Sequence, residues 1–127
     1  MHSWEFRVRI VIFVLALACV GDGTPAHART DFDGAWSILI VTREGPCEAS
    51  LRYGVKVADG TVINDGSAIA SVQGRVSPRG AVRVLVRSGS QWANGSGYLS
   101  KSRGNGVWRG QGMSGTCAGT WVAGRRE

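Results

Sequence analysis

Apolar and polar residues alternate along most of the chain after residue 30, and glycine-containing turns separate the alternating segments. The clearest segment is 81–87, where valine occupies every second position. A period of two residues indicates a β-strand with one face turned toward a core. The pattern predicts eight strands, at residues 35–42, 47–57, 61–64, 67–76, 81–87, 91–100, 107–112 and 116–123.

Short turns join these segments. Asp59-Gly60 is a two-residue hairpin signal, and we expect residues 103–106 to form the turn between the sixth and seventh strands. No segment after the N-terminal region has the 3.6-residue period of a helix. The expected fold class is all-β, an eight-stranded antiparallel up-and-down meander that forms a closed or nearly closed barrel. An open β-sandwich is the alternative.

Glycine and tryptophan concentrate in the last third of the chain. Glycine inside a strand marks a bend or a close approach, and a neighbouring aromatic ring can cover the bare backbone. The alternative is a shallow aromatic platform for a sugar or an apolar ligand. The residues concerned are Trp92, Trp108 and Trp121, with Gly95, Gly97, Gly104, Gly106, Gly110, Gly112, Gly115 and Gly119.

Residues 1–28 have the organisation of a secretory signal peptide. Arg7 and Arg9 precede an apolar run over 10–20, and Ala26-His27-Ala28 ends in a small-x-small pattern. The apolar run is too short to span a membrane, so we expect cleavage after Ala28 and a secreted or periplasmic domain over 29–127. A lipoprotein leader attached through Cys19 is the alternative.

The two remaining cysteines are predicted to form a disulfide. Cys47 and Cys117 are an even set in a secreted domain, where pairing is the rule. A bridge across this separation stabilises the fold by about 4 kcal/mol in the chain-entropy model. In an eight-stranded meander the second and eighth strands begin at the same rim, so the pair also favours a closed barrel. Two buried free thiols are the alternative.

The chemistry of the expected mature domain argues against an enzyme. Both histidines, His2 and His27, precede the cleavage site. With the cysteines paired, neither a His/Cys metal site nor a histidine-activated nucleophile can form. Most carboxylates fall in turns, where aspartate serves backbone geometry, rather than as a facing pair. We therefore expect no catalytic residue, no metal and no cofactor.

Positive charge is in excess, since the formal net charge is +6 and arginine is the main cation. Strand alternation places four arginines on outward positions, where a basic stripe could bind an acidic envelope glycan or lipopolysaccharide. These are Arg75, Arg83, Arg87 and Arg109. Nucleic acid is the less favoured partner. The alternative is that these charges serve solubility and protect strand edges.

Gly34-Ala35-Trp36, at the start of the first strand, resembles the Gly-x-Trp motif of lipocalin-like (calycin) barrels, which include secreted bacterial metalloprotease inhibitors. The resemblance implies that Trp36 closes the barrel floor beneath an arginine, for which Arg125 and Arg126 are the candidates. The chain departs from lipocalins in its shorter domain and in a disulfide that spans most of the sequence.

The whole chain also resembles small secreted proteins of alphaproteobacterial type, some of which are labelled haem-utilisation proteins. That label implies haem binding. The expected mature domain has no histidine, and its tyrosines are Tyr53 and Tyr98, so it is poor in axial ligands.

The leading functional expectation is a non-enzymatic secreted or periplasmic binding module for a small apolar ligand or an envelope polyanion. The alternative is a protein inhibitor, such as a protease inhibitor of calycin-like fold, that acts through a rim and the arm 29–33. An eight-stranded barrel is either filled by its own side chains or holds one small ligand. The inward residues leave both outcomes open.

Overall fold

The computed structural model describes residues 30–66 and 70–126. The predicted signal peptide, Cys19, Arg29 and the start of the predicted fourth strand lie outside the described residues. Within the described ranges, no helix is both long and apolar enough to cross a membrane.

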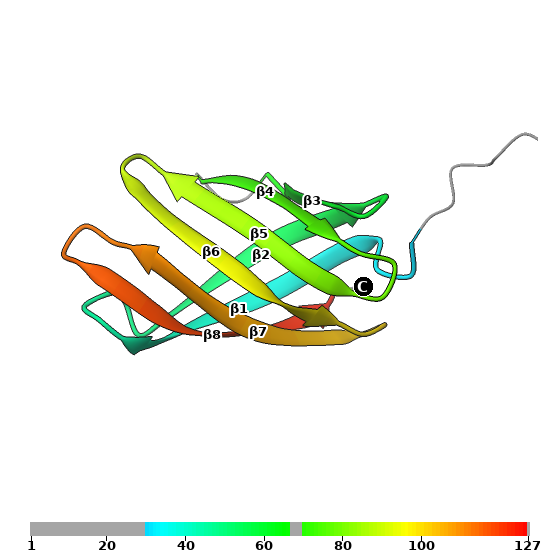
Figure 1. Cartoon of the computed structure of the whole chain (residues 1–127). Helices are drawn as coiled ribbons and strands as arrows, with labels where there is room; N and C mark the ends of the chain where they lie inside the picture. The colour runs from blue at the N-terminus through cyan, green and yellow to red at the C-terminus, as the bar shows by residue number, and fades with distance from the viewer. Residues whose placement is uncertain (1–29, 67–69, 127) are drawn as a thin grey trace, which may run out of the picture.

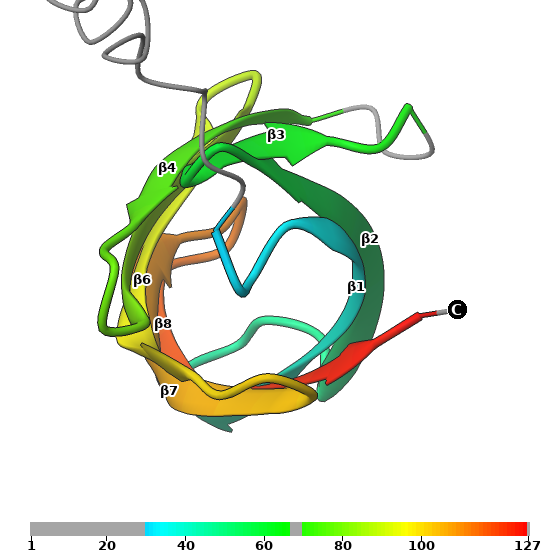
Figure 2. The ribbon, with the colours of Figure 1, turned by 90° about the vertical axis from the view of Figure 1, so that its right-hand side faces the viewer.

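The described residues form a closed antiparallel barrel whose strands follow one another in sequence order (Figures 1 and 2). β1 pairs with β2 on one side and with β8 on the other, which closes the sheet. The predicted all-β meander is confirmed in its closed form, and the open sandwich is wrong. The strands are β1 (Gly34–Glu44), β2 (Ser50–Ala58), β3 (Thr61–Asn64), β4 (Ser71–Val76), β5 (Ala81–Ser88), β6 (Gln91–Leu99), β7 (Arg103–Gln111) and β8 (Thr116–Arg125).

The start of β7 corrects the sequence-based prediction. Residues 103–106 were expected to turn, but they belong to the strand, and the chain turns over 100–102 instead. The backbone N–H of Ser100 donates to the carbonyl of Arg103 and closes this turn. Gly104 and Gly106 remain extended because their inner side is occupied: a Cβ on Gly106 would lie 2.6 Å from the indole of Trp121.

The start of β2 is also later than predicted. The strand begins at Ser50, and Cys47 lies in the preceding loop, which Gly45 enters with a φ of +93°. The predicted disulfide is confirmed: Cys47 is bonded to Cys117 at the start of β8, with the Cα atoms 6.1 Å apart. The bridge ties the β1–β2 loop to the barrel wall.

The packed core lies at one end of the barrel, which we call the floor. Phe32 and Trp36 pack there against Val76, Val82 and Leu99. In Figure 2 the segment before β1 crosses this end of the barrel. The indole N–H of Trp36 donates to the Phe32 carbonyl at 2.8 Å, so the segment that precedes β1 holds the ring in place. The opposite end, near the disulfide, is called the mouth.

Candidate ligand-binding site

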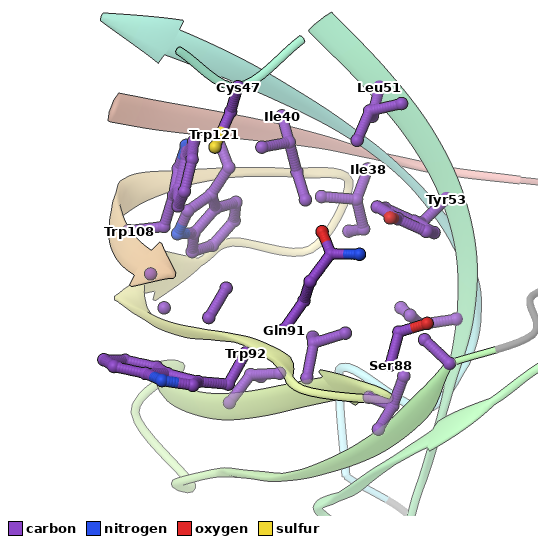
Figure 3. Close-up of a pocket in the computed structure, with 18 of the residues that line it drawn as sticks. Ile38, Ile40, Cys47, Leu51, Tyr53, Ser88, Gln91, Trp92, Trp108 and Trp121 are labelled. Carbon is purple, nitrogen blue, oxygen red and sulfur yellow. The ribbon is translucent and has the colours of Figure 1, made fainter. Parts of the chain in front are cut away.

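A cavity of about 520 Å³ occupies the barrel between floor and mouth (Figure 3). Ligand pockets for small molecules have volumes of roughly 300–1,000 Å³. Its walls come from the inward residues of several strands, which follow the alternation of the sequence: Ile38 and Ile40 of β1, Tyr53 and Val55 of β2, and Val84 and Val86 of β5. Trp36 and Leu99 reach it from the floor. The barrel is therefore an apolar cup.

The cup is hollow because two tryptophans lie against glycines. Trp121 of β8 is the direct partner of Gly106 on β7, and Gly106 is the partner of Gly97 on β6. A Cβ on either glycine would lie 2.6–2.7 Å from the Trp121 ring. The ring thus covers bare backbone on the neighbouring strands instead of filling the centre.

Hydrogen bonds hold both rings in this position. The Trp121 indole N–H donates to the carbonyls of Ser96 and Val107, each at 3.2 Å. Trp108 has a glycine partner on each side, and its indole N–H donates to the Val41 carbonyl at 3.1 Å. For these two residues, the prediction that aromatic rings cover bare backbone is confirmed.

Trp92 does not take part in this arrangement. It lies at the mouth, is 40% exposed and projects away from the centre of the cavity (Figure 3). The aromatic platform that was the alternative for all three tryptophans is therefore not formed by them together.

Polar groups are few in the cup and lie toward its mouth. The Gln91 side chain points into the cavity, among apolar neighbours such as Ile38 (Figure 3). Among the described residues that line the cup, Glu48 is the one with a formal charge, and it comes from the loop that the disulfide anchors. The geometry suits an apolar ligand with a hydrogen-bonding group near the mouth.

The two arginine candidates for the floor have different places. The guanidinium carbon of Arg125 lies 4.6 Å from the centroid of the Trp36 ring, which is 1% exposed. Arg125 also donates to the carbonyls of Asp31 at 2.6 Å and Lys101 at 2.7 Å, and to that of Asp33. Arg126 instead forms an ion pair with Asp65 at 2.8 Å. The cation over the floor tryptophan is Arg125.

Asp33, in the segment before β1, connects this segment to the turn between β2 and β3. The Thr30 hydroxyl donates to its carboxylate, and this is the largest cause that holds the pKa of Asp33 below its ordinary value. Desolvation opposes the effect, and the backbone N–H groups of Asp59 and Gly60 lower the pKa further. The Asp59 N–H lies 3.0 Å from the nearer carboxylate oxygen. The segment before β1 is thereby fixed to the β2–β3 turn.

The four arginines predicted as a basic stripe are all exposed on the outside of the barrel. Arg75, Arg83 and Arg109 line one shallow hollow on this surface, over β4 to β8 and the end of β1. Arg87 does not line it and lies nearer the mouth, opposite Ser71 and Trp92. Arg43, which the sequence pattern did not single out, lines the hollow as well.

The sequence analysis missed several residues of these two sites, among them Gln91, Glu48 and Arg43. Gln91 has the same strand parity as the inward Ala93, so alternation alone could have identified it. Glu48 and Arg43 lie in or beside the β1–β2 loop, where alternation gives no direction. No group of three metal-ligating side chains occurs within residues 30–66 and 70–126.

Comparison with protein-family models, with curated proteins and with solved structures finds no match to this chain.

Proposed function

We propose that this protein is a non-enzymatic binding module that holds one small apolar ligand in its cup. The observation that carries the proposal is the apolar cavity of about 520 Å³ inside a barrel whose floor is closed. Eight strands enclose a space that side chains can fill completely. Here Trp108 and Trp121 are held against the wall by hydrogen bonds, so the centre stays open.

The secreted or periplasmic location is part of the proposal. The Cys47–Cys117 bridge supports it, because disulfides persist in oxidising compartments. The position of Arg125 over Trp36 supports a likeness to lipocalin-like barrels, in which the first-strand tryptophan is covered by an arginine.

The alternative, a protein inhibitor acting through its N-terminal arm, has less support. The described part of that arm, residues 30–33, is tied down: Arg125 binds the carbonyls of Asp31 and Asp33, and Phe32 is buried in the floor. An arm that forms the floor of the barrel is not free to enter a partner's active site.

The test is a titration with the apolar dye N-phenyl-1-naphthylamine. Because Trp108 and Trp121 line the cavity, a bound dye should quench their fluorescence and gain emission by energy transfer. We expect saturable one-to-one binding that medium-length alcohols displace. Dye uptake that never saturates, or that alcohols leave unchanged, would remove the ligand-carrier function.

A further inference from the structure

We propose a second binding site, on the outside of the barrel, for an acidic glycan. Its cationic residues are Arg75 on β4, Arg83 on β5 and Arg109 on β7, which line one hollow of the outer surface. This site is separate from the cup, since its side chains point to the opposite face of the sheet.

The strand register brings two of these arginines together. Arg75 and Arg83 are direct partners across β4 and β5, and both are exposed. Like charges placed directly opposite one another destabilise a sheet. Within the described part of the chain, the ion pair that forms is Arg126–Asp65, so neither arginine is neutralised by a described carboxylate. An anion placed between the two guanidinium groups would remove this repulsion.

Uncharged polar groups connect this pair to the third arginine. Arg83 is the partner of Ser96 on β6, and Arg109 is the partner of Asn94 on the same strand. Arg109 is two strands away from Arg83, which corresponds to roughly 10 Å across the sheet. A hydroxyl and an amide between separated cations suit a ligand that carries acidic groups on a hydroxyl-rich backbone, and this is the chemistry of an acidic glycan.

The remaining lining of the hollow favours a glycan over a nucleic acid. Single-stranded nucleic acids bind through aromatic rings on which the bases stack. Of the described aromatic residues, Trp108 lines the hollow, but its indole is held on the inside of the barrel by its bond to the Val41 carbonyl. Arg43 adds a cation at the far edge, where Glu44 is the acid that lines the hollow.

Arg87 supplies a matched control for this site. It lies on the same strand as Arg83, on the same outward face and is also exposed, but it is outside the hollow. The two are four positions apart, or roughly 13 Å along the strand. Arg83→Gln and Arg87→Gln therefore remove the same charge from neighbouring positions, so a general electrostatic attraction predicts equal effects and a defined site does not.

The experiment is calorimetric titration of the wild type and both variants with a heparin-derived hexasaccharide, at low and near-physiological salt. We expect Arg83→Gln to weaken binding on the order of tenfold, through loss of a charge-assisted contact, and Arg87→Gln by less than about twofold. The plot of log K against log salt has a negative slope, and the magnitude of this slope should decrease by about one in Arg83→Gln. Arg75→Gln repeats the test from the facing strand.

Three results would overturn the proposal. Equal losses in Arg83→Gln and Arg87→Gln would indicate non-specific attraction to net charge. The proposal is also overturned if the wild type does not bind the hexasaccharide, or if it binds single-stranded DNA of equal charge more tightly than the hexasaccharide. Thermal unfolding without ligand controls for folding: Arg83→Gln should melt at or above the wild-type temperature, because a like-charge pair is removed.

Discussion

Arg125 lies over Trp36, with 4.6 Å between the guanidinium carbon and the centroid of the ring, and it ties three chain segments together. Its side chain binds the carbonyls of the segment before β1 and of the β6–β7 turn, while it is itself the last residue of β8. The floor of the cup is thereby fixed by a residue near the end of the chain and another near the start of the barrel.

Replacing Arg125 should loosen the floor. The loss of several charge-assisted hydrogen bonds and of the contact with Trp36 is expected to lower the free energy of unfolding by about 2–4 kcal/mol in Arg125→Ala. Urea unfolding followed by tryptophan fluorescence measures this change. Arg79→Ala, in an exposed turn at the same end, is the control and should change the same quantity by less than about 0.5 kcal/mol. Equal effects would show that Arg125 has no special role.

Asp33 should make stability depend on pH in the acid range. Because hydrogen bonds lower its pKa in the folded state, its contribution is present above the unfolded-state pKa and is lost as the pH falls through the folded-state value. Asp33→Asn should therefore melt below the wild type at neutral pH, with a difference that shrinks toward pH 3. Asp31→Asn is the control: the Thr30 hydroxyl and the Asp59 N–H bind the carboxylate of Asp33 and not that of Asp31, so this variant should not reproduce the dependence. Melting curves at several pH values decide the point.

The disulfide should account for a large part of the stability. It joins residues separated by 70 positions, so its removal in the double variant Cys47→Ser/Cys117→Ser should cost about 4 kcal/mol. Unfolding midpoints of the oxidised and mutated proteins measure the loss. A change below about 1 kcal/mol would mean that the unfolded chain is already restricted near these residues.

Ligand charge should decide which apolar molecules enter the cup. No described lysine or arginine lines it, and Glu48 stands at the mouth, so a buried carboxylate would be uncompensated. Dodecanol should bind on the order of tenfold more tightly than dodecanoate at neutral pH. Glu48→Gln should reduce this difference in affinity, because it removes a negative charge at the mouth. Glu44→Gln is the control, since Glu44 does not line the cup. Tighter binding of dodecanoate would contradict this account.

Strand alternation predicted the all-β fold class and the inward valines of β5, and the short turns with the cysteine pair favoured the closed barrel over an open sandwich. Alternation failed at residues 103–106, where two glycines that resemble a turn belong to a strand: Trp121, fifteen positions after Gly106, covers Gly106, and Leu99 lies against Gly104. A contact between strands is invisible to a pattern that considers only neighbouring residues. The predicted strand order placed Cys47 at the correct rim of the barrel. Alternation nevertheless assigned Cys47 to the second strand, whereas it lies in the loop before β2.

The cup itself could not be predicted from the sequence. Whether an eight-stranded barrel is hollow depends on where its largest side chains lie, and the positions of Trp108 and Trp121 are set by carbonyl groups on other strands. Alternation also placed both Arg83 and Arg87 on the outward face of β5 and could not distinguish them. Only the register of β4 and β5 shows that Arg83, and not Arg87, lies opposite Arg75.

The most direct test of the central claim fills the cup and leaves the outer wall as a control. Val86 faces the cavity, and Leu85 is its neighbour on the opposite face of β5. In a titration with N-phenyl-1-naphthylamine, Val86→Trp should lose at least about tenfold in affinity, because the new ring occupies the ligand's space, while Leu85→Trp should bind like the wild type. Unchanged binding by a folded Val86→Trp, or equal loss in both variants, would contradict a ligand site inside the barrel.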